Sequence, residues 1–356
     1  MPSRSARPAA STSQPLRIGL VGCGAIGAEV ARVVYAGAPQ RYSVVAAIDP
    51  IADRAAAVGE LLSVPRYPSV GAALEAGCPL DAVDLRLPHH LHADATVEAL
   101  RAGRHVLAEK PLAVDRAGAQ RIIEAARMST AVAAVAENYP HLAAVQAARR
   151  AVEEGAIGTI RTLRTTRAYT LSGVWVRDGW RQNAGPSAGV LLDQGTHHAS
   201  LARQLGGDVV AVSAASSRSD LFGSQGETVL MMLRFASGLI GQSLFSWGTP
   251  ARPDECEAEV FGSRGRITIR VSYDERLGRA ELDEGSGTPA TPLSDPENYY
   301  ASHRTIVEDW VAAVRGERSP LVTVDEAAAD LAVVLAARES LARGGGWVAV
   351  AGFADR

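Results

Sequence analysis

The chain has 356 residues, 47% hydrophobic and 21% charged, which is long enough for two domains that each bury a core. A net charge of −3 at pH 7 gives no electrostatic reason to bind nucleic acid or an anionic membrane, and no apolar run is long enough to span a bilayer. The three cysteines are scattered and have no CxxC spacing. They argue against disulfides and against a zinc site, and they favour a reducing, cytoplasmic location.

The basic residues are almost all arginine: of 36, only Lys110 is a lysine. A genome bias towards arginine explains most of this imbalance, because exposed positions tolerate either residue. A lysine kept against that bias indicates a position that needs a compact amine able to reach one oxygen atom. The alternative is that this lysine has been kept by chance. The residues around Lys110 decide between the functional and the chance interpretation.

The chain up to about residue 138 begins with a polar segment and then alternates strands with helices. Residues 1–15 are rich in Ser, Ala, Pro and Arg without the apolar core of a signal peptide, so we expect a disordered tail. Short, continuous apolar runs alternating with helical patterns predict a parallel, doubly wound Rossmann sheet. The expected strands are 16–21, 44–48, 82–87, 105–108 and 131–135, and the expected helices include 92–102 and 115–128.

The pattern changes after about residue 155, where closely spaced strands are separated by glycine-containing turns. This predicts a large, mostly antiparallel sheet with one face covered by helices and the other free for solvent or a second subunit. The expected strands are 160–169, 209–216, 228–235, 239–247, 257–261 and 266–271, followed by helices at 303–314 and 325–342, with a surface loop at 284–297. We therefore predict an α/β chain with a dinucleotide-binding domain over residues 16–138 and a substrate-binding and oligomerisation domain over residues 139–356.

A glycine fingerprint, Gly22-Cys23-Gly24-Ala25-Ile26-Gly27, follows the first strand and opens a helix. The first glycine permits the tight turn, the second lets the backbone approach a pyrophosphate, and the third allows close packing of helix and strand. Such a motif is weak alone, but it is a good signal between an apolar strand and a helix, with an acidic residue about twenty residues further on. A plain turn with three glycines is the alternative.

Asp49, at the end of the second strand, is that acidic residue. A carboxylate there accepts hydrogen bonds from an adenosine ribose and repels a 2′-phosphate, which favours NAD over NADP. Arg54 is near enough in sequence to keep NADP open, and a helix N-cap is the structural alternative for Asp49.

Two further motifs carry residues suited to proton transfer. Glu109-Lys110-Pro111 lies at the carboxyl end of a predicted strand, where open α/β sheets bind ligands. Asp193 and His197 are four residues apart, so they share one face of a helix. Oxidation of an alcohol needs a base for the hydroxyl proton, and histidine is the side chain tuned nearest neutral pH. A structural Asp–His pair is the alternative.

The chain resembles the glucose-fructose oxidoreductase, inositol dehydrogenase and rhizopine-catabolism family of NAD(P)-dependent oxidoreductases. The matching stretches are GCGAIG at 22–27, PHHLHADATVEALRAGRHVLAEKP at 88–111, AENY at 136–139 and WRQNAGPSAGVLLDQGTHH at 180–198. The resemblance implies a Rossmann domain followed by an α/β domain whose open sheet builds dimers or tetramers. It also implies that Lys110, Asp193 and His197 are the catalytic residues, and that the Lys110–Pro111 peptide is cis.

The resemblance extends the candidate cofactor site beyond the glycine fingerprint and Asp49. The full set of candidate cofactor-binding residues is Gly22, Gly24, Ala25, Ile26, Gly27, Asp49, Leu87, Pro88, His92, Glu109, Lys110, Asn138, Trp180 and Arg181.

One strand departs from the family pattern, which usually has small and apolar residues before the proline. Here the strand before Pro88 contains Asp84 and Arg86, which point to the same side. They form a buried pair, or Arg86 reaches the cofactor crevice; the sequence leaves both open.

Three other groups have a functional and a structural interpretation. The histidines His89, His90 and His92 invite a metal, but no carboxylate or cysteine accompanies them, and we expect no metal. Trp175 and Trp180 either stack on a sugar or nicotinamide or pack between domains. Several arginines are solvated sheet residues or partners of a phosphorylated or nucleotide-linked sugar; these are Arg161, Arg164, Arg167, Arg177 and Arg181.

The sequence thus predicts a cytoplasmic, homo-oligomeric NAD-dependent dehydrogenase that oxidises a secondary hydroxyl of a sugar, cyclitol, aminocyclitol or nucleotide-linked sugar. In this hypothesis His197 takes the hydroxyl proton, Asp193 orients His197, and Lys110 holds the reacting oxygen. The alternatives are an NADPH-dependent keto-sugar reductase, an enzyme whose tightly held NAD drives elimination or glycoside cleavage, and a non-catalytic sensor. The substrate and the physiological direction do not follow from the sequence.

Overall fold

The computed structural model describes residues 14–37, 40–176, 179–183, 185, 189–217, 227–249, 256–272, 278–285 and 289–353. Most of the expected tail, and Arg177, lie outside these residues. The chain divides into two compact units. The first holds the residues up to Ala113 together with Ala117–Ala136 and His303–Asp325, and the second holds Val114–Arg116, Glu137–Ser302 and the chain from Glu326 onwards.

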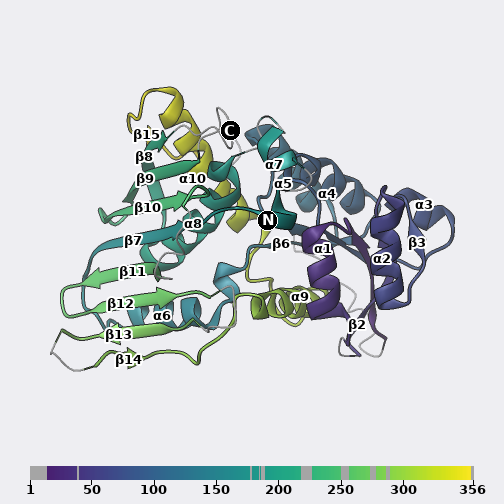
Figure 1. Cartoon of the computed structure of the whole chain (residues 1–356), viewed down its shortest axis with the longest axis horizontal. Coiled ribbons are helices and arrows are strands. Elements are labelled where there is room, and N and C mark those ends of the chain that lie inside the picture. The colour runs from purple at the N-terminus through teal and green to yellow at the C-terminus, as the bar shows by residue number, and fades with distance from the viewer. Residues whose placement is uncertain are drawn as a thin grey trace, which may run out of the picture. The chain divides into compact units, whose positions relative to one another are not determined.

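The first unit contains a parallel six-stranded sheet in the order β3-β2-β1-β4-β5-β6 (Figure 1). Every neighbouring pair in it is parallel, which confirms the doubly wound arrangement expected from the alternating pattern. Its strands are β1 (Leu16–Val21), β2 (Tyr42–Ile48), β3 (Arg66–Tyr67), β4 (Ala82–Leu85), β5 (His105–Glu109) and β6 (Ala133–Ala136).

Helices follow the strands of the first unit and bury both faces of the sheet. Successive residues of one strand face opposite sides: Leu107 of β5 joins one apolar cluster, while Val106 and Ala108 join the other. The helices are α1 (Ala25–Val30), extended by a π-helical turn (Ala31–Tyr35), α2 (Ala52–Leu62), α3 (Val70–Glu75), α4 (His92–Arg101), after a 3-10 turn (His89–Leu91), and α5 (Arg116–Met128).

Helix α9 (Ala301–Val314) adds a late segment of the chain to the first unit. Its Ile306, Val307, Trp310 and Val311 are buried in the same cluster as Ile18 of β1. From the sequence we assigned this segment to a second domain beginning at residue 139. The helical pattern shows that the segment has an apolar face, but it does not show which sheet that face covers. In the structure, residues 303–325 belong to the same unit as the Rossmann sheet.

The second unit contains a nine-stranded sheet in the order β14-β13-β12-β11-β7-β10-β9-β8-β15. All its pairs are antiparallel except β7 with β10, which confirms the mostly antiparallel sheet that the turns predict. The expected surface loop at 284–297 includes one short edge strand, β14. The strands are β7 (Ile160–Ala168), β8 (Val209–Ser217), β9 (Thr228–Phe235), β10 (Ile240–Ser246), β11 (Cys256–Gly262), β12 (Arg266–Arg270), β13 (Ala280–Asp283), β14 (Thr291–Pro292) and β15 (Val348–Ala349).

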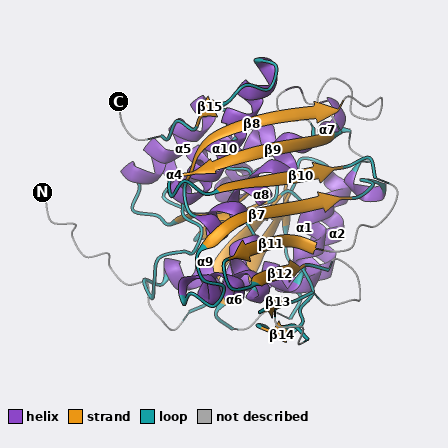
Figure 2. Ribbon diagram, turned by 90° about the vertical axis from the view of Figure 1, so that its left-hand side faces the viewer, coloured by secondary structure: helices purple, strands orange, loops and turns teal. Residues whose placement is uncertain are grey.

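Helices of the second unit lie on one face of this sheet, and Figure 2 shows the strands in front of α6 and α8. β9 alternates buried and exposed residues along most of its length, as expected for a sheet covered on one side. The helices are α6 (Ala143–Glu153), α7 (Trp180–Asn183), α8 (Val190–Gly206) and α10 (Val324–Ala342), with 3-10 turns at Tyr139–His141 and Gly173–Trp175. No helix within the described ranges is both long and apolar enough to cross a membrane.

His198 fixes α8 to the sheet of the second unit. Its ring stacks on Phe245 with centroids 5.0 Å apart, and its Nδ1 lies 2.7 Å from the Thr165 hydroxyl. Because that hydroxyl donates to Ser243, it accepts from Nδ1, which leaves Nε2 without a proton. Burial holds the pKa of His198 well below its ordinary value of 6.5, with the charges of His197 and Arg167 adding to the effect.

The neutral His198 predicts a loss of stability in acid. A pKa lowered by folding gives stability that is complete above pH 6.5 and is lost as the pH falls towards the folded value, because only the unfolded chain takes up the proton. We expect His198→Gln to flatten the decline in unfolding free energy between pH 7 and pH 5 by up to about 1.4 kcal/mol per pH unit. Urea unfolding at each pH measures it, with the exposed His90→Gln as control. Equal slopes in wild type and His198→Gln would contradict the prediction.

Candidate active site

The loop after β1 holds its glycines for two different reasons. Gly22 has a φ of +89°, and a Cβ there would lie 2.4 Å from the carbonyl oxygen of Arg86. A Cβ on Gly27 would lie 1.9 Å from the carbonyl oxygen of Gly22, so both positions require glycine for the fold itself. A Cβ on Gly24 would meet only an Arg54 nitrogen, 3.9 Å away. Gly24 therefore leaves open space in front of the first turn of α1, as a dinucleotide pyrophosphate requires.

Asp49 directly follows β2, and two backbone N–H groups hold its carboxylate. Its Oδ2 accepts a hydrogen bond from the backbone N–H of Cys23 at 2.8 Å, and its Oδ1 accepts one from the N–H of Ile51 at 2.8 Å. The N-cap of α2 is Ile51, so the structural alternative considered for Asp49 is wrong. Each carboxylate oxygen keeps a second lone pair, which suits the ribose hydroxyls of an adenosine.

The Lys110–Pro111 peptide follows β5 and is cis, as the resemblance predicts. Beside it, His92 at the start of α4 contacts two backbone carbonyls: Nδ1 lies 2.6 Å from the oxygen of Pro111, and Nε2 lies 2.9 Å from that of Leu87. His92 thus joins the loops that follow β4 and β5, including Pro88. Burial lowers the pKa of His92, although both carbonyl contacts oppose the shift.

His197 in the second unit has an acidic partner that the sequence analysis did not assign. Its Nδ1 lies 2.7 Å from Oε1 of Glu137, and both side chains are buried. Glu137 directly follows β6, and the edge of the Tyr139 ring meets the His197 ring with centroids 5.2 Å apart. The signal for Glu137 was the AENY stretch after a strand, but the distance of 60 residues between Glu137 and His197 hid the contact.

Asp193 is the anchor of an arginine. Arg181 Nε donates to its Oδ2 at 2.9 Å, and the amide of Gln194 donates to its Oδ1 at 3.2 Å. The Arg181 guanidinium also donates to the carbonyl of Trp175 and lies 4.2 Å from the centre of the Trp180 ring. Helix α8 thus carries two side chains, one turn apart, that have charged partners. Asp193 contacts Arg181 of α7, and His197 contacts Glu137.

The remaining candidate residues divide between the units. The first unit brings together Gly22, Gly24, Ala25, Ile26, Gly27, Asp49, Leu87, Pro88, His92, Glu109 and Lys110 at the carboxyl ends of its strands. The second unit holds Asn138, Trp180, Arg181, Asp193 and His197. Asn138 is buried at the start of the turn that carries Tyr139, and its amide lies 3.5 Å from the Ser302 hydroxyl.

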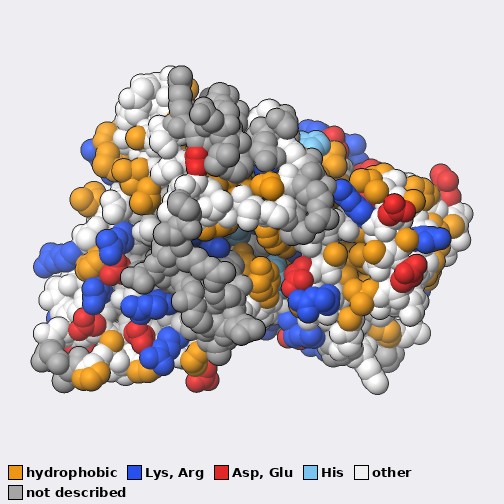
Figure 3. Space-filling model, in the orientation of Figure 1, with side chains coloured by type: hydrophobic (Ala, Val, Ile, Leu, Met, Phe, Trp, Pro, Cys, Tyr) orange, Lys and Arg blue, Asp and Glu red, His pale blue; other side chains and the backbone are white. Residues whose placement is uncertain are grey.

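The positive charge expected around β7 is largely paired with acids. Arg164 forms an ion pair with Glu259, and Arg167 lies 3.5 Å from Glu257. Figure 3 shows the same interleaving of basic and acidic side chains over β11, β12 and β13, where the pairs are Arg266–Asp283 and Arg270–Glu281. These arginines are therefore satisfied within the fold.

Within the described residues no group of three or more His, Cys, Asp or Glu side chains is arranged to hold a metal.

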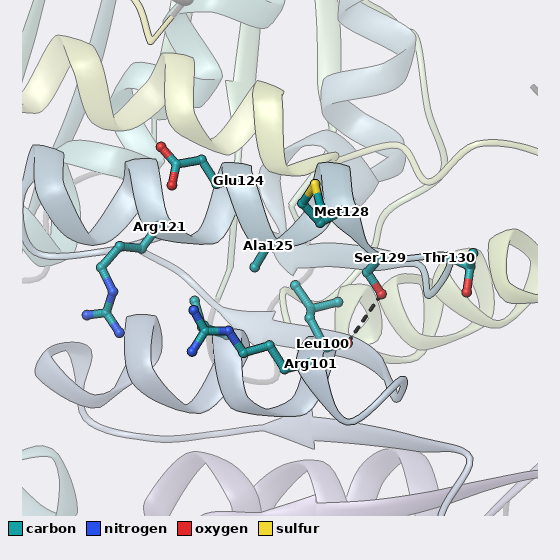
Figure 4. Close-up of a pocket in the computed structure, with 9 residues that line it drawn as sticks. Leu100, Arg101, Arg121, Glu124, Ala125, Met128, Ser129 and Thr130 are labelled. Atoms are coloured by element: carbon teal, nitrogen blue, oxygen red, sulfur yellow. Dashed lines mark hydrogen bonds between the residues drawn. The ribbon is translucent and has the colours of Figure 1, made fainter. Parts of the chain in front are cut away.

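One groove of the first unit lies apart from the candidate site. A groove of 550 Å³ runs between α4 and α5 (Figure 4). It reaches Met128, Ser129 and Thr130, which precede β6, so it opens towards the amino ends of the strands, opposite the glycine loop.

Comparison with known proteins supports an oxidoreductase. Residues 16–137 match the oxidoreductase family with an NAD-binding Rossmann fold, and residues 145–268 match the GFO/IDH/MocA C-terminal domain. The 1,5-anhydro-D-fructose reductase of Ensifer adhaerens is 32% identical over 74% of this chain and 78% of its own length. The inositol 2-dehydrogenase of Rhizobium meliloti is 28% identical over 92% of this chain and 97% of its own.

A solved structure agrees over almost the whole chain. The oxidoreductase TM0312 of Thermotoga maritima superimposes with a TM-score of 0.80 at 28% identity, covering 95% of this chain and 99% of that one. The glycine loop with Asp49, and helix α8 with its buried His197, lie in the two matched regions in turn. The chain belongs to the GFO/IDH/MocA family of oxidoreductases and has its NAD-binding Rossmann domain.

Proposed function

We propose that the chain is an NAD-dependent dehydrogenase that oxidises a secondary hydroxyl of a sugar, cyclitol or aminocyclitol without phosphate groups by hydride transfer. The observation that carries this proposal is the buried contact between His197 and Glu137. A histidine whose Nδ1–H donates to a carboxylate keeps its Nε2 as a proton acceptor, and it can carry the resulting positive charge beside that carboxylate.

In the proposed mechanism the base is His197 and its positioning partner is Glu137. Nε2 removes the proton of the substrate hydroxyl, while the Glu137 carboxylate holds the ring in one tautomer and stabilises the imidazolium. Asp193, one turn before His197 on α8, fixes Arg181 and, through it, Trp180. Trp180 then offers an aromatic face to the sugar or to the nicotinamide.

Lys110 supplies the hydrogen bond to the reacting oxygen and stabilises its developing alkoxide character. Bound NAD supplies the hydride acceptor at C4 of its nicotinamide. The space at Gly24 and the fixed carboxylate of Asp49 fit the pyrophosphate and the adenosine ribose of that cofactor.

The pairing of the arginines supports a substrate without phosphate groups. A phosphorylated or nucleotide-linked sugar needs cations that are available to its phosphates. Arg164, Arg167 and Arg181 each have a carboxylate partner, so recruiting one of them to a phosphate would break an ion pair.

The reverse reaction is the second candidate. A relative that is 32% identical is named a reductase of 1,5-anhydro-D-fructose, and the same residues can protonate a carbonyl oxygen while hydride moves to carbon. Arg54, close to Gly24, is the residue that would favour the 2′-phosphate of NADPH in that reaction.

We also propose that the outer face of the second sheet forms a homodimer or homotetramer interface, as the family resemblance implies. Leu230, Met232 and Ile240 are exposed there, with Ile240 60% accessible. They lie on adjacent strands, since Met232 of β9 pairs with Gln242 of β10 and Ile240 pairs with Arg234. Large apolar side chains exposed together on one face of a sheet are typical of a subunit contact. A cytoplasmic location remains a prediction from the cysteine pattern.

Removal of the base or of the lysine is expected to stop turnover without affecting the cofactor. Lys110→Ala and His197→Ala should each lower kcat by about a thousandfold or more, because each removes a group that acts on the reacting oxygen. The dissociation constant for NADH, measured by fluorescence, should stay within about twofold. Assays use myo-inositol and 1,5-anhydro-D-fructose as probes. Near wild-type kcat in both variants would sink the assignment and favour a non-catalytic role.

Gly24 and Gly22 are expected to respond differently to alanine. Gly24→Ala has room for its Cβ in the free protein, so Tm should be unchanged while the dissociation constant for NADH rises about tenfold or more. Gly22→Ala forces a Cβ against a backbone oxygen at a positive φ and should lower Tm. Thermal unfolding and NADH titration of both variants provide the test. Unchanged NADH binding by Gly24→Ala would place the pyrophosphate elsewhere.

The cofactor preference is expected to depend on Asp49 and Arg54. Wild type should bind NADH more tightly than NADPH, and Asp49→Asn should shift the ratio of the two dissociation constants towards NADPH by about tenfold, because the carboxylate charge repels a 2′-phosphate. Arg54→Gln, the matched variant, should weaken NADPH alone. Tighter binding of NADPH by wild type would support the reductase instead.

A further inference from the structure

Strand β4 and the residue just after it hold two buried charges, where parallel strands are normally apolar. Asp84 is completely buried and Arg86, just past the end of the strand, is 4% exposed. Burial of such ions is opposed by the loss of their hydration, and replacing a buried ion network by apolar residues is often neutral or stabilising. Stability of the sheet alone therefore does not account for this network.

The network links three segments of the first unit through one guanidinium. Arg86 Nε and Nη2 donate to the two oxygens of Asp84 at 2.7 and 3.1 Å, and Nη1 donates to Oε1 of Glu109 at 2.5 Å. The Tyr35 hydroxyl, in the turn that extends α1, donates to Asp84 at 2.7 Å. The Arg86 fork thus bridges from β4 to the last residue of β5.

Glu109 connects Arg86 to the backbone of Lys110. Its Oε1 is held by Arg86, and its Oε2 accepts the backbone N–H of Lys110 at 3.1 Å. Burial alone would raise the pKa of Glu109, but the charges of Arg86 and Lys110 lower it overall, so Glu109 is a carboxylate. On the far side of Lys110, the carbonyl of Pro111 is held by His92. The N–H of Lys110 and the carbonyl of the next residue, Pro111, are therefore each held by a buried side chain.

We propose that Arg86 is a positioning residue that fixes the backbone of Lys110 through Glu109, and so aims its ammonium group at the reacting oxygen. The side chain of Arg86 is completely buried, so it acts through Glu109 and not by contact with cofactor or substrate. Only a planar, multidentate donor can hold Asp84 and Glu109 together, which a lysine could not do. The aim of the ammonium group rests on the proposed function; the restraint of the backbone does not.

The test uses the fact that Lys110 is the only lysine in the chain. Selective labelling with ¹⁵N-lysine gives one backbone amide signal, and it belongs to the N–H that Glu109 accepts. We expect slow hydrogen exchange of this amide in wild type and exchange about tenfold faster or more in Asp84→Leu/Arg86→Met, which gives the strand the apolar character usual in such sheets. Arg86→Gln removes the guanidinium fork without adding a second lysine and should show the same change, so it serves if the double variant does not fold.

The chain offers a matched control in Arg17 and Asp81, a bidentate pair near the other ends of β1 and β4. Arg17→Met/Asp81→Leu should leave the Lys110 amide, the NADH dissociation constant and kcat unchanged. In the test variants kcat should fall about tenfold or more while KM stays within about twofold, because the lost interaction is made in the transition state.

Four outcomes decide the proposal. Faster exchange at Lys110 in the test variants alone, with the fall in kcat, supports it. An unchanged amide in folded test variants overturns it, whatever happens to kcat. Equal changes in the test and control variants also overturn it, since they report general destabilisation. Faster exchange confined to the test variants, in a protein whose wild type turns over no probe, supports the backbone restraint and counts against the proposed function only.

Discussion

The parallel register of the first sheet is the constraint on which the candidate cofactor site depends. Because β1, β2, β4 and β5 run in one direction, the loops that follow them meet at one edge: the glycine turn, Asp49, Leu87 and Lys110. Backbone contacts then lock these loops together. Gly22 touches the carbonyl of Arg86 so closely that no side chain fits, and Asp49 accepts the N–H of Cys23. A substitution that moves one of these loops is therefore expected to move the loops that contact it.

Two of the three candidate catalytic residues, Lys110 and His197, each contact a buried carboxylate. Glu109 holds the backbone of Lys110 in the first unit, and Glu137 holds the ring of His197 in the second. Glu109 is the last residue of β5, and Glu137 directly follows β6. Within each unit, the carboxylate restrains a residue that we propose to act in catalysis, and catalysis needs such rigid geometry.

Sequence alone predicted what depends on local pattern. Strands β1 and β9 have the bounds expected, the glycine loop and Asp49 lie where the fingerprint placed them, and the buried pair of Asp84 and Arg86 was one of two readings. What it missed depends on contacts between distant segments. Helix α9 was assigned to the second domain because its sequence shows an apolar face but not which sheet that face covers. The contact between Glu137 and His197 was not predicted because 60 residues separate them in the sequence. The positions of Lys110 and His197 in catalysis remain proposals.

The most direct test of hydride transfer follows a deuterium atom. Wild-type protein is incubated with NAD and myo-inositol or another polyol that carries deuterium at its carbinol carbons, and the reduced cofactor is analysed by mass spectrometry and NMR. The account predicts that deuterium appears at C4 of the nicotinamide in step with absorbance at 340 nm. Conversion of the polyol without deuterium in the cofactor pool would contradict it.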